Sequence, residues 1–266
     1  MKRKCYAAGL ALAAIVAAGT CSCSVKEDRS GCPCWASVLF KGVYSEPVTA
    51  RFIDSASGDI TREFGSICLD EDGRMYLSEG EVPRLNHEII AFCGSGGVGE
   101  DGVISAPLGC EIDSVSIGHS FIDTRGESAE AVVVMNRQYC EIRVRVLGAQ
   151  NSLYPYSFRV SGNTCGVTVR NGNPVPGPFE YYPTMKDGSF TVNVPRQADD
   201  SLELVVIENL FDVGMIPLGL LIIRSGYDWT RPSLDPISVE LEYSRSGCTV
   251  VISEWASGAE GMRFEI

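Results

Sequence analysis

The sequence predicts an all-β fold, and three of its features carry that prediction. Apolar and polar residues alternate with a period of two in many short segments, which is typical of half-buried antiparallel strands. Turn sequences such as "EDGR" (71–74), "NGNPVPGP" (171–178) and "KDGS" (186–189) separate these segments. The chain also contains 28 glycines and 13 prolines, a composition that disfavours long helices.

Residues 1–22 have the features of an export signal. Lys2, Arg3 and Lys4 form a basic start, and an apolar run over residues 8–19 follows them. This run is too short for a bilayer core, which needs about 20 apolar residues in a helix, but it has the length of a signal-peptide core. We therefore expect the chain to leave the cytoplasm.

The small residues at the end of this signal run into cysteine, as "GTCSC" (19–23), and resemble the lipobox of bacterial lipoproteins. Cys23, which follows Ser22, fits a lipobox best, and Cys21 is the rival. Acylation at Cys23 would make residues 1–22 the signal peptide, and several acyl chains such as palmitate would hold the mature chain in a membrane. The alternative is an ordinary signal peptide with incidental cysteines nearby.

The segment behind Cys23 is charged. Lys26, Glu27 and Asp28 resemble the surface-export signal of Bacteroidetes lipoproteins, which implies a lipid-anchored protein exposed on the outer membrane. The alternative function of these charges is to solvate a tether between the lipid and the folded part. Under both interpretations residues 23–34 form a flexible tether.

The strands fall into two sets. The clearest alternating patterns are residues 141–146, 189–194, 237–243 and 248–255, and the last two are joined by "SRSG", which predicts a hairpin. A mature chain of about 240 residues is long enough for two cores. Because one set of strands ends near residue 136 and another begins there, we predict β-sandwich domains over residues 35–136 and 137–266.

The composition excludes several classes of partner. The formal net charge is −12, and the leader takes three positive charges and no negative ones with it, so about −15 remains in the mature chain. Nucleic acid is not expected as a partner, because phosphate binding needs clustered lysines and arginines. A zinc site is not expected either, since the two histidines are isolated and the cysteines lack paired ligand spacing.

The cysteines beyond the signal have two interpretations. Cys140, Cys165 and Cys248 each share a strand face with valine or isoleucine, which is typical of small buried hydrophobic residues. Cys32 and Cys34 form a C-P-C pair for which a disulfide stays open.

The catalytic motifs for which we searched are either absent or lack the structure that their chemistry needs. "GSGGVG" (94–99) matches the dinucleotide pattern G-x-G-x-x-G, but Gly102 and Pro107 exclude the helix that would hold the pyrophosphate. His119 lies in an alternating strand pattern, and the G-x-S-x-G motif of serine hydrolases is absent from the sequence. We predict no enzymatic activity, and no cofactor other than the covalent lipid on Cys23.

Five segments carry a resemblance to a known family. They are "CSVKEDRSGCPC" (23–34), "HEIIAFCGSGG" (87–97), "NRQYCEIRVRVLG" (136–148), "FEYYP" with "DGSFTVNVPRQADDSLELVV" (179–206) and "CTVVISEW" (248–255). Together they resemble the FimB-like anchor subunits of Bacteroidetes, the minor-fimbrium anchoring lipoproteins. The chain departs from the family at Phe92 and Cys93, where relatives usually carry a tryptophan before the glycine turn.

The resemblance implies two transthyretin-like β-sandwich domains, attachment to the outer membrane through acyl chains, and a role at the base of a fimbrium. In the shaft subunits of such fimbriae a protease removes an N-terminal strand, and a strand from the neighbouring subunit fills the groove. An anchor cannot lose its first strand, because the lipid on Cys23 would leave with it. We therefore expect residues 35–42 to remain as the first strand.

We further expect the anchor to end the polymer by offering residues 251–266 to the last shaft subunit. The alternative is that residues 250–266 complete the chain's own second sandwich. The residues expected on the donated strand are Val250, Val251, Ile252, Trp255, Phe264 and Ile266.

Two other functions stay open from the sequence. One is a tip or accessory subunit of a fimbrium. The other is a surface lipoprotein that binds glycan through flat aromatic side chains, although aromatic residues are also ordinary strand and core material. The aromatic candidates are Tyr154, Tyr156, Tyr181, Tyr182, Tyr227 and Trp229.

Overall fold

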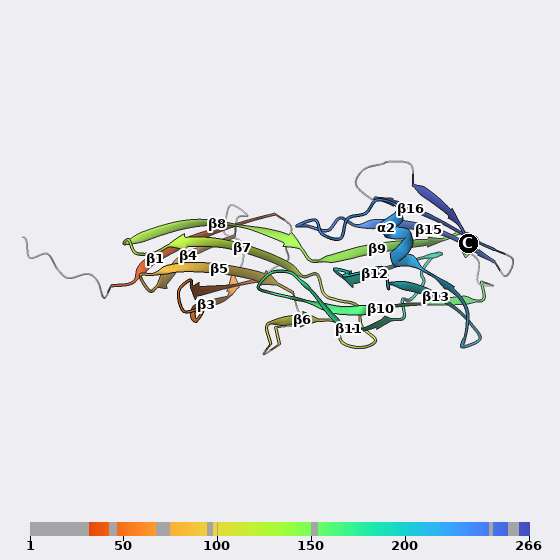
Figure 1. The fold of residues 1–266 in the computed structure, drawn as a ribbon, viewed down its shortest axis with the longest axis horizontal. Coiled ribbons are helices and arrows are strands. Elements are labelled where there is room, and N and C mark those ends of the chain that lie inside the picture. The colour runs from red at the N-terminus through yellow and green to blue at the C-terminus, as the bar shows by residue number, and fades with distance from the viewer. Residues whose placement is uncertain are drawn as a thin grey trace, which may run out of the picture. The chain divides into compact units, whose positions relative to one another are not determined.

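The computed structural model describes residues 32–42, 47–67, 75–94, 98–99, 101–149, 154–244, 247–254 and 261–266. Residues 33–266 belong to one compact unit. The described residues form three β-sheets and one short helix (Figure 1). The predicted all-β fold is confirmed.

The first sheet has seven strands in the order β3-β2-β5-β7-β8-β1-β4. They are β1 (Cys34–Gly42), β2 (Val48–Asp54), β3 (Ile60–Ile67), β4 (Met75–Val82), β5 (Asn86–Cys93), β7 (Ser116–Asp123) and β8 (Ser128–Arg137). The ladder between β7 and β8 covers Ser116, Ile117 and Gly118, and it joins the group β3-β2-β5-β7 to the group β8-β1-β4. β1, the first strand among the described residues, lies between β8 and β4 and is an interior strand of this sheet.

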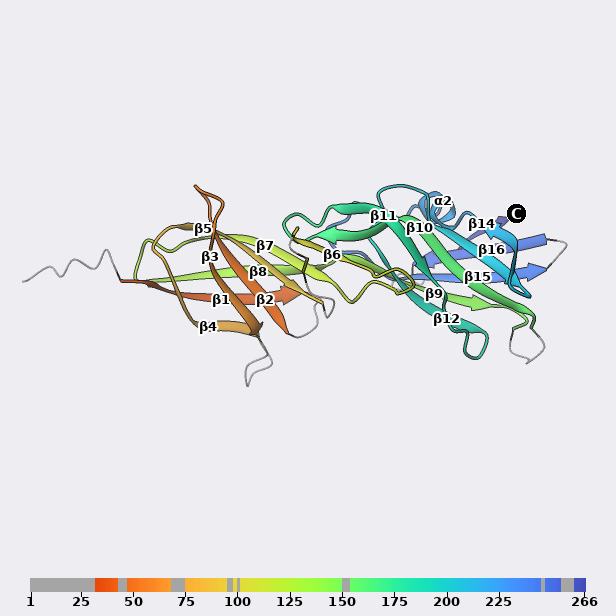
Figure 2. The same ribbon diagram turned by 90° about the horizontal axis from the view of Figure 1, so that it is seen from below.

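β1 is held on both sides. It runs parallel to β8 from Trp35 to Gly42 and antiparallel to β4, and Figures 1 and 2 show it alongside β8. At its end, a Cβ atom on Gly42 would lie 2.3 Å from the carbonyl oxygen of Met135, and the φ angle of Gly42 is +102°. Only glycine fits both the close approach and the backbone angle.

Alternation along β1 explains how it packs. Ala36, Val38 and Phe40 are buried, whereas Trp35 and Lys41 are exposed. The buried set joins one hydrophobic cluster with residues from β2, β5 and β8. β5 differs, because Ile89 and Ala91 face this cluster while Ile90 and Phe92 face a second one, so its apolar run is continuous.

The second and third sheets pack against each other. The second contains β10 (Tyr156–Thr168), β11 (Pro174–Tyr181), β13 (Glu203–Glu208), β14 (Phe211–Ile216) and β6 (Val103–Ser105), with β6 paired to β10. The third has the order β12-β9-β15-β16-β17 and contains β9 (Tyr139–Val146), β12 (Ser189–Pro195), β15 (Ile237–Ser244), β16 (Gly247–Glu254) and β17 (Met262–Glu265). Their inner faces share one hydrophobic cluster, in which the rings of Phe158 and Phe190 lie 5.3 Å apart.

The strongest sequence patterns fold as predicted. On β9, Cys140, Ile142, Val144 and Val146 are all fully buried, and the residues between them face outward. β12 and β15 show the same alternation, and β15 and β16 form the predicted antiparallel hairpin. Alternation with a period of two therefore identified the strands with one buried face.

Two features differ from the sequence-based expectation. "NGNPVPGP" was expected to be a turn, yet Pro174–Tyr181 forms β11, a strand at the edge of the second sheet, where a proline without an N–H can be tolerated. A short helix, α2 (Leu218–Arg224), follows β14 and buries Leu218, Leu221 and Ile222. Among the described residues no helix is long and apolar enough to cross a membrane.

The predicted domain boundary at residues 136–137 falls in the last two residues of β8. Gln138 alone separates β8 from β9, and its N–H donates a hydrogen bond to the carbonyl of Val115. The side chain of Gln138 is buried and donates to the carbonyls of Asn136 and Pro232. The division into two domains stays a prediction, but the junction is tightly hydrogen-bonded.

Candidate functional site

Several predicted site residues lie outside the described part of the chain. They are Cys21, Cys23, Lys26, Glu27, Asp28 and Trp255. Lipid attachment and surface export at these positions stay predictions. Cys32 and Cys34, which lie shortly after Asp28, are free thiols, with Cys32 exposed and Cys34 buried.

The first candidate site is the position of β1. This strand begins at Cys34, close behind the predicted lipid attachment point, and its backbone pairs with β8 on one side and β4 on the other. Its inward side chains fill the hydrophobic cluster of the first sheet. Removal of β1 would therefore leave two unpaired strand edges and an open apolar groove.

The second candidate site is the C-terminal segment. In β16, Val250 and Ile252 are buried in the chain's own core, and Val251 is half-buried on the opposite face. Val250 lies opposite Phe264 of β17, and the N–H and C=O of Ile266 both bond to Cys248. Residues 250–254 and 262–266 thus complete the third sheet, as the alternative interpretation expected.

β17 is the last strand of the third sheet and pairs with β16 on one side. Phe264 packs partly against the core, whereas Met262 and Ile266 are about half exposed. Within the C-terminal segment, β17 is therefore the part that would break the fewest contacts on leaving its own sheet. Donation of this segment to a partner stays a prediction, and β17 is the portion best placed for it.

The structure also contains a cleft of about 820 Å³ that the sequence did not predict. Four separate segments line it: β7 with the adjoining residues of β5 and β8, the turn from Arg170 to Pro174, the segment from Arg196 to Ala198, and the loop from Trp229 to Pro232. These segments are remote in sequence, so no short motif could have indicated the cleft.

Arg196 organises one wall of this cleft. Its Nε–H donates to Oε1 of Gln138 at 3.0 Å, and its terminal N–H groups donate to the carbonyls of Trp229 and Pro232. The guanidinium is buried, and burial lowers the pKa of Arg196, an effect that Tyr227 and Asp228 partly offset. The fork geometry of arginine thus ties the loop at 229–232 to the start of β9.

A second group in the cleft is centred on Glu88. Its carboxylate is 2.7 Å from Nε2 of His119 and 3.1 Å from the guanidinium of Arg170. Burial alone would raise the pKa of Glu88, but the hydrogen bonds and charges of His119 and Arg170 outweigh this effect and lower it. Glu88 thereby links Nε2 of His119 on β7 to Arg170, which lies in the turn after β10.

The other sequence candidates are dispersed. After β5 the chain turns at Gly99 and Gly102 and enters β6, so the described residues 98–99 and 101–115 contain no helix for a dinucleotide site. The described residues also contain no cluster of three His, Cys, Asp or Glu side chains that could hold a metal ion. Of the aromatic candidates for glycan binding, Trp229 is the one that lines the cleft.

Comparisons with known proteins give similarity in structure but not in sequence. No protein-family model matches the chain, and no curated protein matches it. A candidate polysaccharide-binding protein from Bacteroides thetaiotaomicron aligns with a TM-score of 0.59 and 12% identity, covering 84% of this chain and 99% of that chain. A candidate adhesin from Bacteroides ovatus aligns with a TM-score of 0.58 and 14% identity, over 87% of this chain and 95% of the other.

A third solved structure bears directly on the family resemblance. The fimbrial anchor protein Mfa2 from Porphyromonas gingivalis aligns with a TM-score of 0.55 and 11% identity, and the match covers 84% of this chain and 98% of that chain. The chain has the fold of a Bacteroidetes fimbrial anchor, and its resemblance to this group of proteins is confirmed at the level of the fold.

Proposed function

We propose that the protein is a lipid-anchored fimbrial subunit that attaches the base of a fimbrium to the outer membrane. The observation that carries this proposal is the position of β1, which is paired on both sides and packed into the core directly behind the predicted lipobox. The fold shared with the fimbrial anchor Mfa2 supports the same function.

An anchor has to transmit force from the shaft to the lipid. Acyl chains on Cys23 would hold the mature N-terminus in the membrane. Because β1 has a ladder on each side and buries Ala36, Val38 and Phe40, a pull on the tether must break both ladders before the strand can leave. An interior strand is therefore a suitable attachment point for a load-bearing anchor.

The partners in this proposal are the shaft subunits. The anchor ends shaft growth by β-strand exchange, in which an extended segment adds to the sheet of the neighbouring subunit. β17 is the segment that we propose for donation, because it is short, lies at a sheet edge and contributes one half-buried aromatic residue to the core. A catalytic role is not part of the proposal.

The proposal is tested by replacing the acylated cysteine in cells that assemble the fimbrium. Cys23→Ala should release fimbriae with the bound subunit into the medium, and Cys21→Ala is the matched control that should leave them attached. A tip or accessory subunit would give a different result, since fimbriae would stay on the cell in both variants. Retention of fimbriae in both variants would therefore overturn the anchor function, whereas release by Cys21→Ala alone would assign the lipid to Cys21.

A further inference from the structure

The cleft between Arg196 and Arg170 is unusual for so acidic a chain. Three arginines line it, Arg170, Arg196 and Arg231, and Glu88 is the one carboxylate among its described lining residues. The chain as a whole carries a formal charge of −12. Arg231 is paired with Asp235, which does not line the cleft, and Arg170 shares Glu88 with His119, so the positive charge that would attract an anionic ligand is chiefly that of Arg196.

The charges in the cleft are not fully compensated by the protein. Glu88 is already bonded to His119 and Arg170. The acceptors around Arg196 are a carboxamide and two carbonyls, and among the described residues no carboxylate lies within ion-pair distance of it. Buried charges in proteins are normally paired, so an anion near this guanidinium would be stabilised.

Other residues that line the cleft are suited to bind the hydroxyl groups of a ligand. Asn136, Asn171 and Asn173 line the cleft. Nδ2 of Asn136 and Oδ1 of Asn171 already bond to the backbone, but a carboxamide has further donors and acceptors that can bind a sugar hydroxyl. Trp229 also lines the cleft, and its buried Nε1–H has no hydrogen-bond partner among the described residues. A buried donor of this kind is costly to leave without an acceptor.

The size of the cleft fits a small oligosaccharide. Its volume of about 820 Å³ lies within the range of roughly 300–1,000 Å³ that ligand pockets occupy. We propose that this cleft binds a carboxylated saccharide, such as a uronic or sialic acid residue. Arg170 and Arg196 contact the carboxylate of the sugar, and the asparagines form hydrogen bonds with its hydroxyl groups. This proposal goes beyond anchoring and does not depend on it.

The test is calorimetric titration of the folded, unlipidated chain with matched sugars. The acidic probes are trigalacturonic acid and sialyllactose, the neutral counterparts are galactotriose and lactose, and sodium acetate is the plain anion. At least one acidic probe should bind about tenfold more tightly than its neutral counterpart, as expected for a charge-assisted contact. Its affinity should fall as salt is added.

Two variants should move this affinity in opposite directions. Arg170→Gln removes a cation from the wall and should weaken binding about five- to tenfold. Glu88→Gln removes the wall's carboxylate but keeps a polar side chain, and it should strengthen binding of the acidic sugar. Arg145→Gln, an exposed position on β9 that does not line the cleft, is the matched control. Thermal melts confirm that each variant is folded.

Several outcomes would overturn the proposal. If no acidic probe binds at millimolar concentration, the cleft is not a binding site for acidic saccharides. Equal affinity for acidic and neutral sugars would show that the cleft does not recognise the carboxylate. Equal effects of Arg170→Gln and Arg145→Gln on the affinity would lead to the same conclusion. Displacement of the sugar by an equal concentration of acetate would show an anion site without selectivity for saccharides.

Discussion

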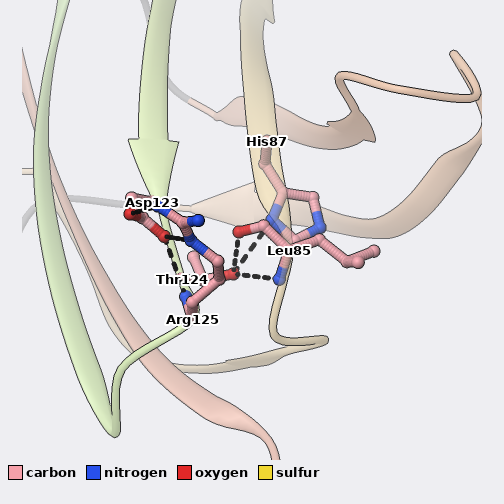
Figure 3. Close-up of polar contacts among 5 residues, drawn as sticks. All are labelled: Leu85, His87, Asp123, Thr124 and Arg125. Carbon is pink, nitrogen blue, oxygen red and sulfur yellow. Dashed lines mark hydrogen bonds and ion pairs between the residues drawn. The ribbon is translucent and has the colours of Figure 1, made fainter.

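Nδ1 of His87 lies 3.1 Å from Oγ1 of Thr124 inside the first sheet, although the two residues are 37 positions apart. The same hydroxyl is 2.6 Å from the carbonyl of Pro83 and 3.0 Å from that of Leu85, and it accepts the N–H of Leu85 at 3.2 Å. Figure 3 shows the contacts of this hydroxyl with His87 and Leu85. Thr124 follows β7 and His87 lies on β5, so this network fixes the connection between β4 and β5 against the end of β7.

The hydroxyl has one hydrogen and two lone pairs, so the tautomer of His87 depends on which contact takes that hydrogen. If the hydrogen is donated to Pro83, the lone pairs accept the N–H groups of Leu85 and of His87 Nδ1. Nε2 of His87 is then an unprotonated nitrogen, buried beside the ring of Phe52, without a partner among the described residues. Protonation of Nε2 would create a buried N–H with no acceptor.

This geometry predicts a pH dependence of stability. Burial lowers the pKa of His87 below its ordinary value of 6.5, and the charge of Asp54 offsets part of that effect. The unfolded chain therefore takes up a proton at a higher pH than the folded chain. The stability due to neutral His87 is present above about pH 6.5 and is lost as the pH falls, by at most about 1.4 kcal/mol per pH unit. Urea denaturation between pH 5 and 8 measures this slope.

His87→Phe is the matched variant for that experiment, because it keeps an aromatic ring but cannot titrate. Its slope between pH 5 and 7 should be smaller than that of the wild type. Identical slopes in the two proteins would contradict the assignment of a buried neutral His87.

The Thr124 hydroxyl should matter more than its methyl group. Thr124→Val preserves the shape of the side chain but leaves buried polar groups of Leu85 and Pro83 without this partner, so the free energy of unfolding should fall by about 2–3 kcal/mol. Thr124→Ser keeps the hydroxyl and should lose about 1 kcal/mol. Chemical denaturation distinguishes them, and an equal loss in both variants would show that packing and not hydrogen bonding is responsible.

β1 should be essential to the first sheet. Phe40 is 2% exposed, and Phe40→Ala should lower the free energy of unfolding by about 3–5 kcal/mol because it leaves a cavity between the strands. Lys41→Ala, at the next and exposed position, should change it by less than about 0.5 kcal/mol. Similar effects at both positions would mean that β1 is not an integral strand, and the load-bearing argument would fail.

β17 should be dispensable for folding but required for capture of the shaft. Deletion of residues 258–266 removes one edge ladder and the half-buried Phe264, so circular dichroism should stay that of a folded β-protein, with a loss of about 1–2 kcal/mol in stability. The deletion should abolish co-purification of shaft subunits. A truncated protein that still captures them would contradict the proposed strand donation.

The sequence was most informative where burial alternates along one strand. β9, β12, β15 and β16 follow a period of two, because one face of each meets the core and the other meets solvent. β11 was missed because its prolines resemble a turn, and a sheet edge tolerates them for reasons that are not visible locally. The parallel pairs β1 with β8 and β9 with β15 join strands that are far apart in the chain, so periodicity could not predict them.

The candidate site was less predictable than the fold. The cleft depends on Arg196 reaching Gln138, Trp229 and Pro232, which are 33 to 58 positions away in the chain. The segment "VPRQADDS" around Arg196 was noted for its family resemblance, but nothing in its pattern marked a buried arginine. Trp229 was one of six aromatic candidates, and only the fold distinguishes it from Tyr227, whose hydroxyl bonds to the carbonyl of Asp235.

The most direct test of the anchor function is the intact mass and N-terminal analysis of the protein purified from outer membranes, with a pull-down for polymeric partners. An anchor should begin at a triacylated Cys23, keep Lys26, Glu27 and Asp28, retain β1 and co-purify with a ladder of shaft subunits. An unlipidated chain that begins after Arg29 or Arg51 would contradict the anchor function, because processing of the first strand would make the protein a shaft or tip subunit.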